Sequence, residues 1–225
     1  MNKILKRLEK YQQAELMKYV DNPSPKHASV MGRATPNILL KDEDIKLPTF
    51  PENNCDKTKN ELLFLERLTS NLSRSDIQLI KNTDEAMIEN LFMKDYVYPD
   101  KDEIIEKLYD LKSQINTFTM RQKYKFNRPR PQQLAEIFDY KINVFESKTT
   151  ATPSYPSGHT TLAYVIAYIS ADMNPSNRDK DLALANSVAH ARMLMGVHYP
   201  SDNSASIALA KQIYKAIDKS WFAEV

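Results

Sequence analysis

Apolar residues recur at helical spacing along most of the chain. Within the range 101–126 they come at alternating intervals of about four and three positions, which places them on one face of an α-helix. These residues are Ile104, Leu108, Leu111, Ile115 and Phe118. The same spacing predicts helices over 3–20, 56–72, 158–172, 178–195 and 201–219, one or two over 75–94, and a short one near 132–140. No stretch alternates with period two, so the sequence predicts an all-α fold, a single-domain helical bundle.

Two proline-rich segments interrupt the helical pattern. The first, 22–54, contains Pro23, Pro25, Pro36, Pro48 and Pro51. Proline lacks a backbone N–H and restricts the residue before it, so we expect an irregular surface arm or linker with no regular element. The chain accordingly divides into an N-terminal helix and arm over 1–54 and a helical core over 55–225. The second segment, 127–157, is a long connection of a kind that is uncommon unless it carries function.

Composition excludes several classes of protein. The 225 residues include only three glycines, several-fold fewer than the ~7% of average usage, whereas β-sandwiches, propellers and dinucleotide-binding folds depend on glycine turns. A single cysteine, Cys55, excludes a disulfide framework and a cysteine-based zinc site. The 31 Lys and Arg against 29 Asp and Glu give a net charge of +2, too small for a protein that binds nucleic acid through bulk charge.

The same inventory sets the expected environment of the protein. No run of about 18 apolar residues is present, so we expect no membrane-spanning helix. Charged residues interrupt the N-terminal stretch and leave no apolar region of a signal peptide, so we expect a cytoplasmic location. The single cysteine also fits a reducing compartment.

One histidine occupies an inward position at the start of a helix. Counting back by three or four residues from the apolar stripe of 158–172 reaches His159, in the first turn. Ser157 is a favourable N-cap ahead of it, and Gly158 allows another group to approach the backbone closely. A helix start offers free N–H groups and the positive end of the helix dipole, so this position predicts an anion site.

A second cluster follows the helix predicted at 178–195. Arg192 occupies a core-facing position in its last turn, where a guanidinium needs a carboxylate or phosphate partner. The chain then turns at Gly196 and presents His198, with Asp202 four residues later. Asp202 is close enough to accept a hydrogen bond from one ring nitrogen of His198, which leaves the other nitrogen as a nucleophile or base.

A third cluster ends the helix predicted at 101–126. Lys123 is followed seven positions later by Arg130, and the prolines on either side of Arg130 hold it in a defined direction. Taken singly, these features have structural explanations: a core histidine, an internal ion pair or a solvated basic strip. Taken together, two arginines, a lysine, a helix start and two histidines, one oriented by an aspartate, favour a bound tetrahedral oxyanion beside a nucleophile. These are the groups that phosphoryl transfer without a metal ion requires.

The order and spacing of the clusters resemble the signature of the type 2 phosphatidic acid phosphatase superfamily, which includes bacterial class A acid phosphatases and vanadium haloperoxidases. Its first motif, Lys, six residues, Arg-Pro, is similar to the range 123–131, and its second, Pro-Ser-Gly-His, is present at 156–159. Its third, Ser-Arg, five residues, His, three residues, Asp, is present except that Ala191 replaces the serine. A second Arg-Pro pair begins at Arg128 and would put Arg121 at the lysine position, so we prefer the first alignment.

The resemblance implies a role for each motif residue. The phosphate oxygens would be bound by Lys123, Arg130, Ser157, Gly158 and Arg192. His198 would attack phosphorus and form a phosphohistidine, and Asp202 would orient it. His159 would protonate the leaving alcohol and then activate water. No metal or cofactor is implied, and His27 and His190 match no motif and are expected to be structural.

We therefore expect a phosphomonoesterase similar to the soluble bacterial class A enzymes, inhibited by vanadate and acting on a small phosphate ester that the sequence does not name. Selectivity is expected from the loop at 132–155 and from the N-terminal arm. Two alternatives stay open: a vanadate-dependent haloperoxidase, since the same pocket holds vanadate, and a non-catalytic phosphate-binding protein. No nucleic-acid partner and no membrane span are expected, and association into a homo-oligomer stays open.

Overall fold

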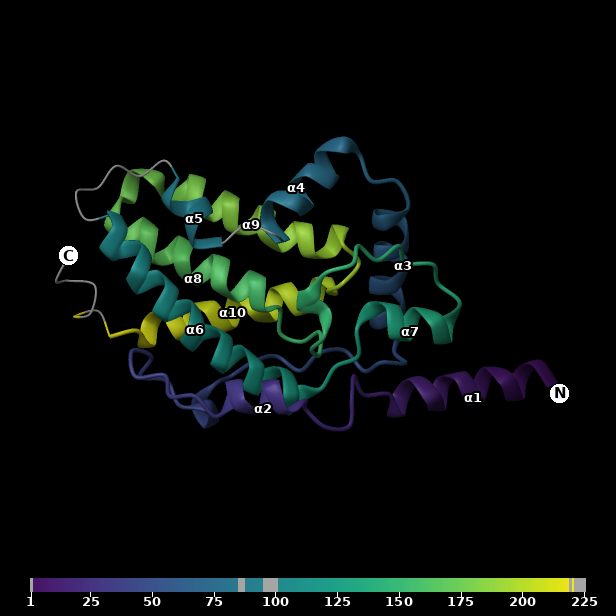
Figure 1. The fold of residues 1–225 in the computed structure, drawn as a ribbon. Coiled ribbons are helices and arrows are strands. Elements are labelled where there is room, and N and C mark those ends of the chain that lie inside the picture. The colour runs from purple at the N-terminus through teal and green to yellow at the C-terminus, as the bar shows by residue number, and fades with distance from the viewer. Residues whose placement is uncertain (1, 85–87, 95–100, 219, 221–225) are drawn as a thin grey trace.

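The structure, a computed structural model, describes residues 2–84, 88–94, 101–218 and 220, and these are mainly helical (Figure 1). Among them no β-strand forms, and the only sheet-like pairing is an isolated antiparallel bridge between Ile38 and Ile217. The predicted all-α class is therefore confirmed. The α-helices are α1 (Asn2–Leu16), α2 (Pro25–Met31), α3 (Asp56–Ser70), α4 (Arg74–Asp84), α5 (Ile88–Met93), α6 (Lys101–Phe126), α7 (Pro131–Phe138), α8 (Gly158–Met173), α9 (Arg178–Leu194) and α10 (Pro200–Ala216). The short 3-10 turns are η1 (Asp42–Asp44), η2 (Lys148–Thr150) and η3 (Pro175–Asn177).

Most predicted helices appear within a few residues of their expected ends. The helix α6 has the predicted bounds, and α8 and α9 each differ from the prediction by one residue at their C-terminal end. The range 75–94 contains two helices, α4 and α5, and residues 85–87 between them lie outside the described part. The helix α1 ends at Leu16, four residues before the predicted end at position 20.

The prediction that 22–54 holds no regular element is wrong. Pro25 begins the helix α2, where its fixed φ suits the first helical position and its missing N–H costs nothing. Ser24 caps the same helix, because its hydroxyl accepts a hydrogen bond from the His27 N–H at 3.3 Å. Pro25, one of the prolines that indicated an irregular arm, therefore begins a helix, and η1 adds a second short element to the arm.

Helix α8 lies in the middle of the core. It packs against α5, α6, α9 and α10, and Figure 1 shows it lying between α9 and α10. Because neighbours cover it on most sides, its buried apolar residues are not confined to one stripe. They include Leu162, Ala163, Val165, Ile166, Ala167 and Ile169. Fully buried alanines on the packed helices, such as Ala163 and Ala185, allow these helices to approach one another closely.

The N-terminal arm packs along one side of the core, as the purple segments of Figure 1 show. Helix α1 contacts α7, and α2 contacts α6. Two backbone hydrogen bonds join the arm to the end of α10, from the Leu39 N–H to Ala216 at 2.7 Å and from the Asp218 N–H to Asn37 at 3.1 Å. The arm therefore places α2 beside the last turns of α6, which carry Lys123.

Within the described residues, none of the helices has both the length and the apolar character needed to cross a membrane.

Candidate active site

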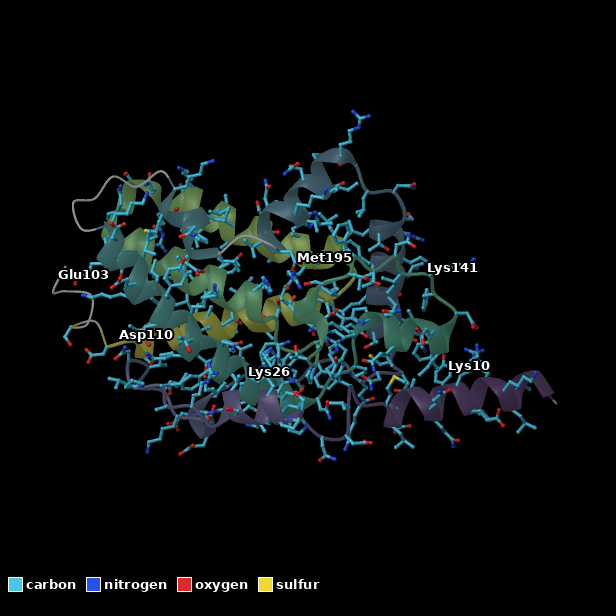
Figure 2. All side chains as sticks on the ribbon, in the orientation of Figure 1. Lys10, Lys26, Glu103, Asp110, Lys141 and Met195 are labelled. Atoms are coloured by element: carbon cyan, nitrogen blue, oxygen red, sulfur yellow. The ribbon has the colours of Figure 1, made fainter. Side chains whose placement is uncertain are left out.

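A cavity of about 490 Å³ brings most of the predicted site residues together. Six of the eight line it: Lys123, Arg130, Gly158, His159, Arg192 and His198. They come from the ends of α6 and α9, the starts of α7 and α8, and the turn before α10. Ser157 and Asp202 are fully buried and lie outside its lining. The helix α2 contributes Lys26, labelled in Figure 2, so the arm forms part of the wall.

The turn after α9 aims His198 at the cavity. Gly196 adopts a φ of +68°, and a Cβ at this position would stand 2.7 Å from the Cγ2 of Ile142 and 3.2 Å from the backbone oxygen of Asn143. Only glycine meets both requirements, the left-handed backbone and the close approach of the loop. Two residues later His198 is 2% exposed.

Hydrogen bonds fix the tautomer of His198. Its Nδ1 lies 3.2 Å from Oδ2 of Asp202, which also accepts from the Tyr199 N–H at 3.0 Å. Its Nε2 lies 3.1 Å from Nη1 of Arg130, and because a guanidinium only donates, Nε2 is the acceptor. Burial, and then the charge of Arg130, lower the pKa of His198 well below its usual value. The ring is therefore neutral, with its proton on Nδ1 and a lone pair on Nε2.

A buried arginine, Arg128, holds the other oxygen of Asp202. Its Nη1 donates to Oδ1 of Asp202 at 2.6 Å and to Oγ of Ser201 at 2.8 Å, and its Nη2 donates to Glu61 at 3.2 Å. Its guanidinium carbon lies 3.7 Å from the centre of the Tyr199 ring. Burial alone would raise the pKa of Asp202, but Arg128, followed by His198, holds it below the usual range. Asp202 is therefore a carboxylate that supports His198.

The two Arg-Pro pairs thus occupy different places. Arg130 lines the cavity, whereas Arg128 lies behind Asp202 and does not reach the lining. Arg121, the lysine-position residue of the alternative alignment, pairs with Asp42 at 3.0 Å and also lies outside the lining. The geometry favours the alignment that pairs Lys123 with Arg130.

The loop that precedes α8 holds the two cations of the first motif. Nε of Arg130 donates to the backbone oxygen of Thr152 at 2.8 Å, and Nη1 donates to that of Val197 at 2.7 Å. Nζ of Lys123 donates to the backbone oxygen of Pro153. Burial, and then the charge of Arg192, lower the pKa of Arg130 to about 10, and burial lowers that of Lys123 well below its usual value. Nearby negative charge therefore compensates both cations poorly, and an anion bound in the cavity would stabilise their charged forms.

His159 stands at the start of α8 with its side chain 20% exposed. Burial, followed by the charge of Arg192, lowers its pKa well below the usual value, which favours the neutral ring. Ser157 caps the helix, because its Oγ accepts from the Thr160 N–H at 3.4 Å and from the Thr160 hydroxyl at 3.0 Å. The Ser157 N–H is also engaged, donating to Ser206 at 2.7 Å. The structure therefore shows Ser157 shaping the helix start.

The sequence did not single out Asp84, which ends α4 and enters the cavity wall. Nη1 of Arg192 donates to Oδ1 of Asp84, and its Nη2 donates to Oγ1 of Thr149 at 2.9 Å. Nη1 of Arg192 also makes a hydrogen bond of 3.1 Å to the sulfur of Met195, the C-cap residue of the same helix, labelled in Figure 2. The sequence pattern around Asp84 predicts only the end of a helix and gives no sign of the cavity.

The remaining histidines occupy different positions. His27 lines the cavity, with its Nδ1 2.7 Å from the hydroxyl of Tyr124, whereas the motifs predict only a structural role for it. His190 is half-buried on α9 and does not line the cavity. Throughout the described part of the chain, no three His, Cys, Asp or Glu side chains come together in a group that could hold a metal ion.

Fold and site together define an all-α protein with a buried cationic pocket that faces a histidine–aspartate pair. Residues 113–217, which contain all three motifs, match the family model of the PAP2 superfamily, in agreement with the resemblance that the motifs predict. A non-specific acid phosphatase from Providencia stuartii is 29% identical over 173 residues, covering 73% of this chain and 69% of the relative. A solved structure of a transmembrane PAP2 type phosphatidylglycerolphosphate phosphatase from Bacillus subtilis aligns over 99% of this chain and 96% of its own, with 16% identity and a TM-score of 0.40.

Proposed function

We propose that the protein is a phosphatase that hydrolyses small phosphate monoesters through a phosphohistidine on His198, without a metal ion. The observation that carries this proposal is a neutral histidine, backed by a buried carboxylate, that faces a cavity lined by Lys123, Arg130 and Arg192. The similarity to a non-specific acid phosphatase supports the same reaction class.

The first chemical step transfers the phosphoryl group to the protein. Nε2 of His198 forms a bond to phosphorus while the bond from phosphorus to the ester oxygen breaks. The departing oxygen takes a proton from His159 and leaves as an alcohol. Asp202 accepts the Nδ1 proton of His198 in a hydrogen bond and stabilises the positive ring that forms.

The second step returns the histidine. A water molecule attacks phosphorus, gives a proton to the now neutral His159, and breaks the bond between phosphorus and Nε2 of His198. Inorganic phosphate and both histidines in their starting states result. Cations placed before the reaction starts stabilise the charge on the equatorial oxygens in both steps, which is the main source of rate in phosphoryl transfer.

Binding of the substrate should protonate His159. Burial, and then the charge of Arg192 and the other cations, lower the pKa of His159 and favour the neutral ring. A bound phosphate dianion offsets the charges of Lys123, Arg130 and Arg192, so it raises the pKa of His159 and favours the protonated form. The general acid is therefore formed by the group on which it acts.

The test is hydrolysis of p-nitrophenyl phosphate by the full chain. We expect turnover in the wild type and no turnover in His198→Ala, while the half-buried His190→Ala variant, outside the cavity, keeps normal turnover. A denaturing quench at alkaline pH of the wild type with labelled substrate should trap a base-stable, acid-labile label that His198→Ala lacks. Near-normal turnover in His198→Ala would contradict the proposal.

Two further measurements separate this function from its alternatives. Vanadate should compete with substrate, and EDTA should leave turnover unchanged. Loss of turnover with EDTA, restored by a divalent ion, would contradict the metal-free step. Oxidation of bromide by added hydrogen peroxide on the vanadate-loaded protein, with no ester hydrolysis, would instead assign a haloperoxidase, and phosphate binding without any turnover would assign a binding protein.

A further inference from the structure

A carboxylate lines the anion-binding cavity. Among the described residues that form its wall, Asp84 is the one acidic side chain. It is 12% exposed, and its Oδ1 accepts hydrogen bonds from Nη1 of Arg192 and, at 3.0 Å, from Oγ of Ser147. Arg192 is 1% exposed, so this pair is nearly withdrawn from solvent.

Asp84 supplies a negative charge to a cavity wall that is otherwise cationic. Lys123 and Arg130 make their hydrogen bonds to uncharged groups, backbone oxygens, a hydroxyl and a neutral imidazole. A buried guanidinium without an anion is costly, and Asp84 supplies that anion to Arg192. Carboxylate and phosphate oxygens present the same acceptor geometry to arginine, so Asp84 occupies a place that a phosphoryl oxygen would otherwise take.

Asp84 also stands near the proposed general acid, but that contact is weaker. Its Oδ1 lies 4.0 Å from Nε2 of His159, beyond hydrogen-bond distance. Its hydrogen bonds go instead to Arg192 and Ser147. The geometry therefore favours a role of Asp84 in binding of the anion over a role in proton transfer by His159.

We propose that Asp84 is an internal competitor for the phosphate site, displaced from Arg192 by the phosphoryl group of the substrate and returning to expel inorganic phosphate after hydrolysis. This inference rests on the proposed function. Its physical basis is repulsion, because two anions that share one guanidinium at short distance destabilise each other. The consequence is a site that binds phosphate weakly enough to release it.

The experiment is calorimetric titration of inorganic phosphate into the full chain. Asp84→Asn keeps the shape of the side chain and removes its charge, and we expect the dissociation constant to fall by about 10- to 100-fold, the factor carried by one charge-assisted hydrogen bond. Ser147→Ala removes the hydrogen bond that holds Oδ1 in place, so we expect a smaller decrease in the same direction. Glu136→Gln, on an exposed residue outside the cavity, makes the same charge change and should leave the constant unaltered.

Turnover gives an independent readout. In Asp84→Asn the inhibition constant of phosphate against p-nitrophenyl phosphate should fall by the same factor as the dissociation constant. An unchanged or weaker phosphate affinity would overturn the proposal, as would a loss of rate confined to alkyl phosphates, which would place Asp84 with His159. Ser147→Ala decides the matter if Asp84→Asn does not fold, as judged by circular dichroism. Because titration needs no turnover, a wild type that binds inorganic phosphate but does not hydrolyse p-nitrophenyl phosphate would refute the proposed function alone.

Discussion

Replacing Arg128 by methionine should destabilise the protein and disturb the support of the nucleophile. Methionine keeps much of the length of the side chain but leaves the carboxylates of Asp202 and Glu61 without their shared cation. Those carboxylates lie 2.6 and 3.2 Å from the guanidinium, and the arginine itself is 0% exposed. Removing one partner of a buried ion pair costs about 3–5 kcal/mol, a large part of the roughly 5–15 kcal/mol that holds a domain folded.

The same change should make the loss depend on pH. The folded-state pKa of Asp202 lies below its usual value, so its ionisation contributes stability that is present above about pH 3.9 and is lost as pH falls through the folded pKa. Without Arg128, burial acts on Asp202 with less opposition and the folded pKa rises. The loss of stability on acidification should therefore begin at a higher pH in Arg128→Met than in the wild type.

Urea unfolding followed by circular dichroism, near neutral pH and at about pH 4, measures both effects. Adding Glu61→Gln to Arg128→Met removes one stranded charge and should recover part of the lost free energy of unfolding, on the order of 1 kcal/mol. Arg74→Met, on an exposed residue at the start of α4, is the control and should stay within about 0.5 kcal/mol of the wild type. A loss below about 1 kcal/mol at neutral pH would refute the view that Arg128 holds the two carboxylates.

Two other variants test the helix ends that form the site. His159→Ala should slow the pre-steady-state burst by about 10²–10⁴-fold with an alkyl phosphate and far less with p-nitrophenyl phosphate, whose leaving group needs no proton; equal losses would reject His159 as the general acid. Gly196→Ala should cost about 2 kcal/mol or more in urea unfolding, because the new Cβ would clash with Ile142 and sit on a left-handed backbone. Gly32→Ala, with φ −78° and its nearest contacts at 3.7 Å, is the matched control and should be neutral or slightly stabilising. Comparable losses in both variants would contradict the view that the turn at Gly196 requires glycine.

The helices could be predicted because their signal is local. The apolar spacing of α6 sets its ends at Lys101 and Phe126 without knowledge of its neighbours. The helix α2 was missed for a physical reason, since a proline both breaks a helix and begins one, and only the surrounding backbone decides which. Its start depends on the hydroxyl of Ser24 and on packing against α6, neither of which a count of prolines reveals.

In the candidate site, too, contacts between residues close in the sequence could be predicted and contacts between distant residues could not. His198 and Asp202 are four positions apart across the start of α10, and this short separation alone predicts that they meet. Arg192 and Asp84 are separated by 108 positions, and Arg128 and Glu61 by 67, so these pairs exist only because helices far apart in the sequence pack together. The sequence predicted that Arg192 needs an anionic partner but could not name which carboxylate supplies it.

The buried charges of the site explain why it should bind a dianion. With Lys123 protonated, the cations Lys123, Arg128, Arg130 and Arg192 face the carboxylates Glu61, Asp84 and Asp202, an excess of one positive charge. Arg128 is already committed to Glu61 and Asp202, so the unbalanced charge lies at the cavity. When Asp84 withdraws, the excess of these buried groups becomes two, and the protonated His159 of the proposed mechanism adds a third positive charge beside the phosphate dianion. The return of Asp84 would lower the positive excess by one and would place a second anion beside the bound phosphate dianion. The two anions repel each other, so one carboxylate can couple entry of the substrate to release of the product.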